Sequence, residues 1–163
     1  MKIIGIDPGL TKTGVGIIEV KGNNLYYVFS DTIYTSPNDD LSSRLSKFHN
    51  ELSNIINCYK PNEAAIEETF VNKNPLSSLM LGHARGALIL TLGIFNLKVK
   101  EYSTTSIKKT VVGIGRAEKE QIQSMIKILL PKSSFKTSDE ADALAVAICH
   151  NNMKLRYYTK SHL

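Results

Sequence analysis

The sequence is poor in cysteine and in long apolar runs, and it shows no internal repeat or low-complexity tract. Its two cysteines, Cys58 and Cys149, lie far apart and outside any CxxC spacing, which favours free thiols in a reducing cytoplasm. The longest apolar run, residues 87–95, is interrupted by a threonine and a glycine and is too short to span a bilayer. The start of the chain has no signal-peptide pattern, because Lys2 leads directly into a strand-like run. These absences disfavour a disulfide-stapled secreted scaffold and a membrane protein, and a cytoplasmic protein is expected.

What the chain does contain is typical of a globular protein. Its 163 residues suffice for a sizeable core, and 42% hydrophobic against 21% charged residues is an ordinary balance. We expect one domain over residues 1–153 and a short C-terminal tail over residues 154–163. The net charge is +5, and residues 96–136 alone hold nine basic residues against three acidic ones. This distribution fits a surface for a polyanion, and a solvated lysine-rich face would have the same composition.

Hydrophobic periodicity predicts an α/β fold. Short apolar or alternating runs indicate strands over residues 3–6, 14–20, 25–34, 64–67 and 98–102. Apolar residues at helical spacing indicate helices over residues 40–57, 76–95, 118–130 and 137–154. Residues 104–111 are interpreted as a polar and basic segment that leads into a glycine loop. Elements in this order imply a mixed five-stranded sheet flanked by helices.

The predicted helix over residues 76–95 is apolar on most of its faces. Asn74 is a good N-cap for it, and Pro75 is a good first residue. Gly82 and Gly86 lie about one turn apart within it. A helix of this kind needs cover on all sides, either from the rest of the fold or from another subunit.

Asp7 stands at the end of the first predicted strand. Ile3 to Ile6 is a short apolar run that suits a strand covered on both faces, and Pro8-Gly9 ends it. A buried carboxylate must be paired, hydrogen-bonded or bound to a metal ion, since an unpaired buried charge costs several kcal/mol. Taken alone, this stretch favours a simple turn cap, because aspartate often accepts hydrogen bonds from the backbone that follows it.

A pair of acids begins the last predicted helix. Asp139 and Asp142 lie three residues apart, and therefore on one face of a helix that is otherwise almost wholly apolar. The helix dipole explains an acid at Asp139 but explains Asp142, a turn further in, poorly. Two buried acids side by side require protonation or a cation. Glu140 is left out of this pair, because it forms a capping box with Thr137.

Four carboxylates can therefore converge at one edge of the sheet, since Glu67 ends a strand as Asp7 does. The candidates are Asp7, Glu67, Asp139 and Asp142. Oxygen ligands suit a hard divalent cation, and the sequence holds no Cys/His cluster of the zinc type. Two Mg²⁺ ions in such a site can activate a water and stabilise the leaving oxygen of a phosphodiester. The basic segment would supply attraction for a nucleic-acid backbone.

Five blocks of the sequence, in this order and spacing, resemble the RuvC family of bacterial Holliday-junction resolvases. They are GIDPGLTKTGVG, AIEETFVNKN, LGHARGA, KKTVVGIGRAEKEQIQ and DEADALAVAICH. The likeness extends to about residue 152, and several of the blocks are individually specific.

The resemblance implies a ribonuclease H-like fold and a homodimer that resolves four-way DNA junctions in recombination and DNA repair. It implies Mg²⁺-dependent nicks placed symmetrically in two opposite strands, leaving 5′-phosphate and 3′-hydroxyl ends. Two metal ions per active site are expected, with Mn²⁺ as a possible substitute. The implied protein partners are RuvA and RuvB, which drive branch migration, and no membrane is involved.

The resemblance also assigns roles to single residues. By motif match, the catalytic and metal-binding acids fall on Asp7, Glu67, Asp139 and Asp142. Some family members have histidine at the position of Asp139, so an acid is the less rigid requirement there. The functional lysines fall on Lys108 and Lys119, and the loop aromatic that inserts at the junction falls on Phe70. Without the resemblance, the lysines are equally well explained as solvated surface and Phe70 as a core residue.

Two other classes of protein compete with the nuclease. The segment IGIDPGLTKTG is also similar to the first phosphate loop of actin-like sugar kinases and ATPases, but those proteins need two such domains and a second acidic glycine loop. A non-catalytic junction-binding module is the other rival. It would have no reason to place four acids beside a negatively charged ligand, because each acid repels phosphate unless a metal is present. A metal-dependent nuclease is therefore the favoured prediction.

Overall fold

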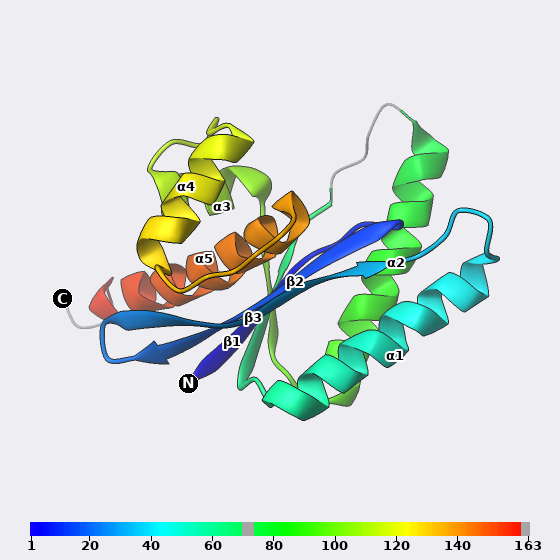
Figure 1. Ribbon diagram of the computed structural model, residues 1–163, viewed down its shortest axis with the longest axis horizontal. Coiled ribbons are helices and arrows are strands. Elements are labelled where there is room, and N and C mark those ends of the chain that lie inside the picture. Colours follow the sequence, from blue (N-terminus) through cyan, green and yellow to red (C-terminus); the bar gives the residue numbers. More distant parts are fainter. Residues whose placement is uncertain (70–73, 161–163) are drawn as a thin grey trace.

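The structure is a mixed five-stranded sheet with helices on both faces (Figure 1). It is a computed structural model that describes residues 1–69 and 74–160, the last five of them by their backbone alone. The elements in chain order are β1 (Lys2–Asp7), β2 (Lys12–Lys21), β3 (Asn24–Tyr34), α1 (Leu41–Tyr59), β4 (Glu63–Glu67), α2 (Pro75–Ile94), β5 (Val99–Tyr102), α3 (Thr104–Val112), α4 (Lys119–Leu129) and α5 (Ser138–Lys160). All five predicted strands are present, and the predicted fold class is confirmed.

β1 is the central strand of the sheet, whose order is β3-β2-β1-β4-β5. The meander β1–β2–β3 is antiparallel, whereas β4 pairs parallel with both β1 and β5. Ile3, Ile4 and Ile6 are fully buried. The apolar run of β1 thus reflects a strand covered on both faces, as predicted.

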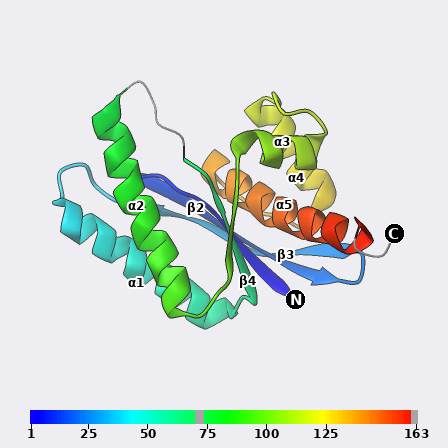
Figure 2. The ribbon, with the colours of Figure 1, turned by 180° about the vertical axis from the view of Figure 1, so that it is seen from behind.

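Two hydrophobic clusters lie on opposite faces of the sheet. Helices α3, α4 and α5 cover one face, and α1 and α2 cover the other (Figures 1 and 2). Side chains alternate between the two along each strand, so that Ile3 packs toward α5 while its neighbour Ile4 packs toward α1 and α2. The sheet is therefore the middle of three layers.

Glycines let α5 lie directly on β1 and β2. A Cβ atom at Gly14 would be 2.0 Å from the carbonyl oxygen of Asp139, and one at Gly5 would be 2.2 Å from the carbonyl oxygen of Ala143. At Gly16 an added Cβ would come within 2.7 Å of a backbone nitrogen of α5. Any larger residue would push the helix off the sheet, so these positions set the depth at which α5 sits.

The N-terminal end of α5 is held by Thr137 and Glu140, although the predicted capping box forms only in part, because Glu140 reaches the residue before the N-cap. Thr137 Oγ1 accepts the N–H of Glu140 at 3.1 Å, and the Glu140 carboxylate accepts the N–H of Lys136 at 3.2 Å. Glu140 is only 4% exposed and also accepts a hydrogen bond from Ser30 Oγ of β3 at 2.7 Å. Glu140 is therefore fully used in anchoring the helix to the sheet, which agrees with its exclusion from the candidate site.

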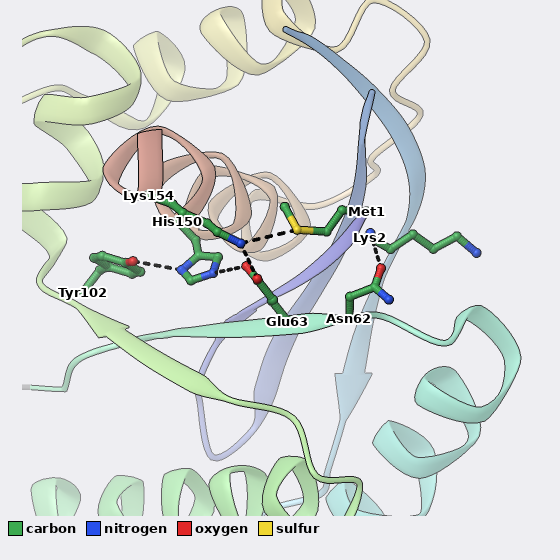
Figure 3. A network of polar contacts seen from close by, with 7 residues as sticks. All are labelled: Met1, Lys2, Asn62, Glu63, Tyr102, His150 and Lys154. Carbon is green, nitrogen blue, oxygen red and sulfur yellow. Dashed lines mark hydrogen bonds and ion pairs between the residues drawn. The ribbon is translucent and has the colours of Figure 1, made fainter. Parts of the chain in front are cut away.

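The second half of α5 is held by a partly buried polar network (Figure 3). His150 Nε2 lies 2.9 Å from a carboxylate oxygen of Glu63 in β4, and its Nδ1 lies 2.8 Å from the hydroxyl of Tyr102 in β5. Lys154, one turn further along α5, pairs with the other oxygen of Glu63. These contacts connect α5 with β4 and β5, which the glycines of β1 and β2 do not fix.

Residues 104–111 form a helix, α3, and the prediction of a polar segment without helix was wrong. Ser103 caps this helix, because its hydroxyl accepts the N–H of Ser106 at 3.3 Å, and Gly113 ends it with a φ of 92°. Ile107 and Val111 are buried one turn apart and dock it on the core. Tertiary packing here outweighs the low helix propensity of a segment rich in threonine and valine.

α5 is longer than predicted, since it runs to Lys160 rather than to about residue 154. Residues 155–160 contain neither proline nor glycine, so nothing in them stops a helix. The domain boundary predicted after residue 153 therefore falls inside a continuous helix.

α2 is covered on one side only. Asn74 and Pro75 begin it as predicted, with the Asn74 side chain accepting the N–H groups of the next turn. Ala84, Leu88 and Leu92 are buried against the domain, whereas four large apolar side chains are exposed, namely Leu76, Leu79, Leu90 and Ile94. By length and composition α2 could cross a membrane, with 22% of its apolar window buried. The rest of the described chain therefore covers only part of this helix, and full cover would have to come from another subunit.

Candidate active site

Asp7 and Glu67 lie side by side at one edge of the sheet. β1 and β4 are parallel neighbours, and the last residue pair in their register is Ile6 with Ile66. The next residue on each strand is an acid, so the two carboxylates emerge together where the strands end.

The first turns of α5 bring two further acids to the same edge. Asp7 is paired with Gly14 across the β1–β2 ladder, and Gly14 lies directly under the backbone of Asp139. Asp142 follows three residues later on the same face of the helix. The close approach that Gly14 permits is therefore what places Asp139 and Asp142 beside Asp7.

The acids interact strongly enough to alter one another's ionisation. Burial raises the pKa of Asp7 well above its ordinary value, and the charges of Glu67, Asp142 and Asp139 raise it further. Burial also raises the pKa of Asp142 to about 6, with Glu67 and Asp139 again raising it, whereas Lys119 and Lys108 lower it. The site thus concentrates negative charge that a bound cation would neutralise.

Lys108 and Lys119 lie close enough to these acids to offset part of their charge. Lys119 lowers the pKa of Asp7 and of Asp142, and Lys108 lowers that of Glu67 and of Asp142. Lys108, on α3, donates a hydrogen bond to the carbonyl oxygen of Ala117 at 2.7 Å. It thereby tethers the loop that leads into Lys119, the first residue of α4.

Thr104 is a site residue that sequence reasoning missed. It is the first residue of α3, and its hydroxyl donates a hydrogen bond to the Glu67 carboxylate. Burial raises the pKa of Glu67, and the hydrogen bond from Thr104 and the charge of Lys108 partly reverse this. No sequence signal marked Thr104, because the contact depends on how β4, β5 and α3 pack.

A cavity of about 250 Å³ opens between the ends of β1 and β4. Asp7, Glu67 and Thr104 line it together with Pro8 and Leu81. Within residues 1–69 and 74–160, no three acidic, histidine or cysteine side chains are already arranged around one point as metal ligands. The donor set nevertheless fits a hard divalent cation, because all four candidates are carboxylates and their mutual repulsion is relieved when an ion binds.

The structure therefore brings together six of the seven residues singled out by sequence. Four are acids from β1, β4 and α5, and two are lysines from α3 and α4. The seventh, Phe70, lies outside the described residues.

A mixed sheet of this order, with carboxylates at the ends of its central strands and a helix of acids laid across it, is that of a ribonuclease H-like nuclease. The sequence model of the crossover junction endodeoxyribonuclease RuvC matches residues 3–150. The chain belongs to the RuvC family of crossover junction endodeoxyribonucleases, which are metal-dependent.

Individual relatives agree with this assignment. The crossover junction endodeoxyribonuclease RuvC of Rhizobium johnstonii is 51% identical over 150 residues, covering 92% of this chain and 89% of the relative. That of Brucella anthropi is 50% identical over 150 residues, covering 92% and 87%. The structure of Thermus thermophilus RuvC in complex with a Holliday junction substrate superposes with a TM-score of 0.90, at 28% identity and 96% coverage of both chains.

Proposed function

We propose that this protein resolves four-way DNA junctions by nicking two opposite strands symmetrically, in recombination and DNA repair in the cytoplasm. The observation that carries the proposal is the convergence of four carboxylates from β1, β4 and α5 beside two lysines, in a chain of the RuvC family. The products would carry 5′-phosphate and 3′-hydroxyl ends.

Mg²⁺ is the proposed cofactor, two ions per site, with Mn²⁺ able to replace it. Asp7, Glu67, Asp139 and Asp142 would hold the ions, since they are the acids whose charges act on one another. When bound, the metal would supply activation of the attacking water and charge for the leaving oxygen. A metal-free site repels a phosphate, so the same acids make binding of the scissile phosphate depend on the cation.

Lys108 and Lys119 would face the DNA backbone at the site. Both are near enough to influence the acids, so a phosphate that enters between the carboxylates also meets two positive charges. Phe70 is proposed as the aromatic that stacks at the junction, because it lies three residues after Glu67 in the sequence.

A twofold dimer through α2 is the second part of the proposal. A four-way junction offers two equivalent strands, and a C2 dimer presents two identical sites to them. Leu76 and Leu90 of α2 are 66% and 65% exposed, and Gly82 and Gly86 have open space where a partner helix could approach. An apolar groove of about 540 Å³ between α1 and α2 adjoins this face.

A second copy covers this face better than a lipid bilayer does. The opposite side of α2 closes the core through Ala84, Leu88 and Leu92, and α2 could not leave the domain without uncovering it. Arg85, near the middle of the helix, also pairs with Glu101 of β5. Both features hold α2 on the domain, whereas a spanning helix would need apolar surface all round. RuvA and RuvB are included as partners on the family resemblance alone.

The direct test uses a synthetic four-way junction with each strand labelled in turn, incubated with and without Mg²⁺. We expect nicks at matching positions in two opposite strands, only with metal, and sealing of these nicks by DNA ligase. Asp7→Asn protein prepared in the same way controls for contaminating nucleases. Equal cleavage of a linear duplex, or nicking by the Asp7→Asn protein at the wild-type rate, would refute the proposal.

A further inference from the structure

We propose that the relay Tyr102–His150–Glu63, built around the buried His150, positions the active-site carboxylates, with His150 as its central positioning residue. The inference rests on the proposed function, because it concerns the acids assigned to that site. None of the three side chains is among the proposed ligands, and each lies on a different element: Tyr102 on β5, His150 on α5 and Glu63 on β4 (Figure 3).

The charge of Glu63 sets the direction of one hydrogen bond in the relay. Burial opposes ionisation of Glu63, but hydrogen bonds from Lys154 and His150 outweigh it and lower the pKa of this carboxyl, which therefore stays ionised. An ionised carboxylate only accepts, so His150 Nε2 carries the hydrogen that it donates to Glu63 at 2.9 Å. His150 Nδ1 lies 2.8 Å from the Tyr102 hydroxyl, and this second hydrogen bond completes the relay.

Tyr102 connects this relay with Glu67. The two residues are paired in the register of β4 and β5, and the carbonyl oxygen of Tyr102 accepts the N–H of Glu68 at 2.9 Å. Tyr102 also immediately precedes Ser103, which caps α3, and so determines where Thr104 meets Glu67. A Tyr102 side chain anchored on His150 thus fixes the backbone on one side of the Glu67 carboxylate.

His150 connects the same relay with the acids of α5. It lies eight residues after Asp142 on one continuous helix, at a rise of about 1.5 Å per residue. His150 is 6% exposed, so a ring nitrogen that lost its hydrogen bond would be left without water to replace it, which is costly. The glycines fix α5 against β1 and β2, and the relay fixes it against β4 and β5. Together they set the separation of Asp142 from Glu67.

Metal binding by the free protein reports this separation directly. Tyr102→Phe removes one hydroxyl without changing the ring, and His150→Phe removes both hydrogen bonds while Lys154 still pairs with Glu63. Mn²⁺ affinity is measured by titration calorimetry at 25 °C, together with the Mg²⁺ dependence of single-turnover nicking. Tyr59→Phe is the matched control, because Tyr59 stacks on Phe29, 4.5 Å between ring centroids, in the cluster on the other face of the sheet.

We expect Tyr102→Phe and His150→Phe each to weaken Mn²⁺ binding about 3- to 10-fold, less than the 10- to 100-fold typical of a group that bonds a ligand directly. The half-saturating Mg²⁺ concentration should rise in parallel, and junction binding without metal should be unchanged. The double variant should be no worse than His150→Phe, because the Tyr102–His150 contact that Tyr102→Phe breaks is already lost in His150→Phe.

Wild-type Mn²⁺ affinity in Tyr102→Phe, or additive losses in the double variant, would overturn the inference. Affinity is measured on folded protein well below its unfolding temperature, so a loss of stability alone does not imitate the effect. If the wild-type protein binds Mn²⁺ but does not nick a junction, the proposed function fails while the relay is still tested by calorimetry.

Discussion

Replacing Gly14 by alanine should damage the active site by displacing the start of α5. The added Cβ would lie 2.0 Å from the carbonyl oxygen and 2.5 Å from the carbonyl carbon of Asp139, whereas real Cβ contacts essentially never fall below 3.0 Å. Both partners are backbone atoms, so no side-chain rotation relieves the overlap. β2 and α5 must separate locally by about 1 Å, which as overpacking costs about 1–3 kcal/mol of unfolding free energy.

The displacement acts on Asp139 and Asp142 relative to Asp7. A misplacement of about 1 Å at reacting groups lowers rates on the order of 100-fold, so nicking should fall more than stability suggests. Unfolding in urea gives the stability, and single-turnover nicking at saturating protein gives the rate. Gly93→Ala in α2 is the matched control. There an added Cβ meets, among the described residues, nothing within 4 Å beyond the adjacent residues and the backbone of its own helix, and the helix should gain up to about 1 kcal/mol. A Gly14→Ala protein with wild-type stability and nicking would show that the glycine does not set the position of α5.

Four further outcomes are expected. Asp7→Asn and Asp142→Asn should each slow nicking by orders of magnitude yet keep or tighten metal-free junction binding, because a charge that repels phosphate is lost; nicking near the wild-type rate would contradict this. Burial raises the pKa of Asp142 from 3.8 to about 6, so the stability from its bound proton is present below pH 4 and is lost as pH rises through 6. The stability of the metal-free wild-type protein should therefore fall between pH 4 and 6 by more than that of Asp142→Asn, as measured by urea midpoints. Equal pH profiles of the urea midpoint would refute the raised pKa of Asp142. Thr104→Val should raise the half-saturating Mg²⁺ concentration severalfold, and Thr104→Ser should restore it, because the hydroxyl donates to Glu67. An unchanged Mg²⁺ dependence in Thr104→Val would show that this hydrogen bond does not support metal binding. Gly86→Leu should shift the protein toward monomer in sedimentation, and a variant that stays dimeric would exclude the α2 interface.

Local patterns identified most elements and the acids. Ile3 to Ile6 is a short β-branched run and becomes a buried strand, and Asn74-Pro75 begins a helix where capping rules place it. Thr137 also caps the last helix as expected, through its hydroxyl and the N–H of Glu140. These features succeed because hydrogen bonding and burial within one element depend on residues close in sequence.

Local sequence patterns did not predict those features that depend on contacts between residues far apart in the sequence. Residues 104–112 form a helix because Ile107 and Val111 pack into the core, and the composition of the segment does not predict this packing. α2 shows a second limit: its apolar composition predicted cover from the fold or from another subunit, and the single chain leaves one face open. Composition states how much apolar surface a helix carries, and only the packed chain states which part of it is covered.

The sequence by itself determined that two acids end strands and two begin a helix, since strand ends and helix starts depend on residues that are close in sequence. Only the tertiary structure decided that these acids meet. The parallel register of β1 and β4 aligns Asp7 with Glu67, and the missing Cβ at Gly14 lets Asp139 approach across more than a hundred residues of chain. The contacts of Thr104 with Glu67 and of His150 with Tyr102 and Glu63 are of the same kind. Each depends on positions of whole elements within about an ångström, which only the close packing of the complete core specifies.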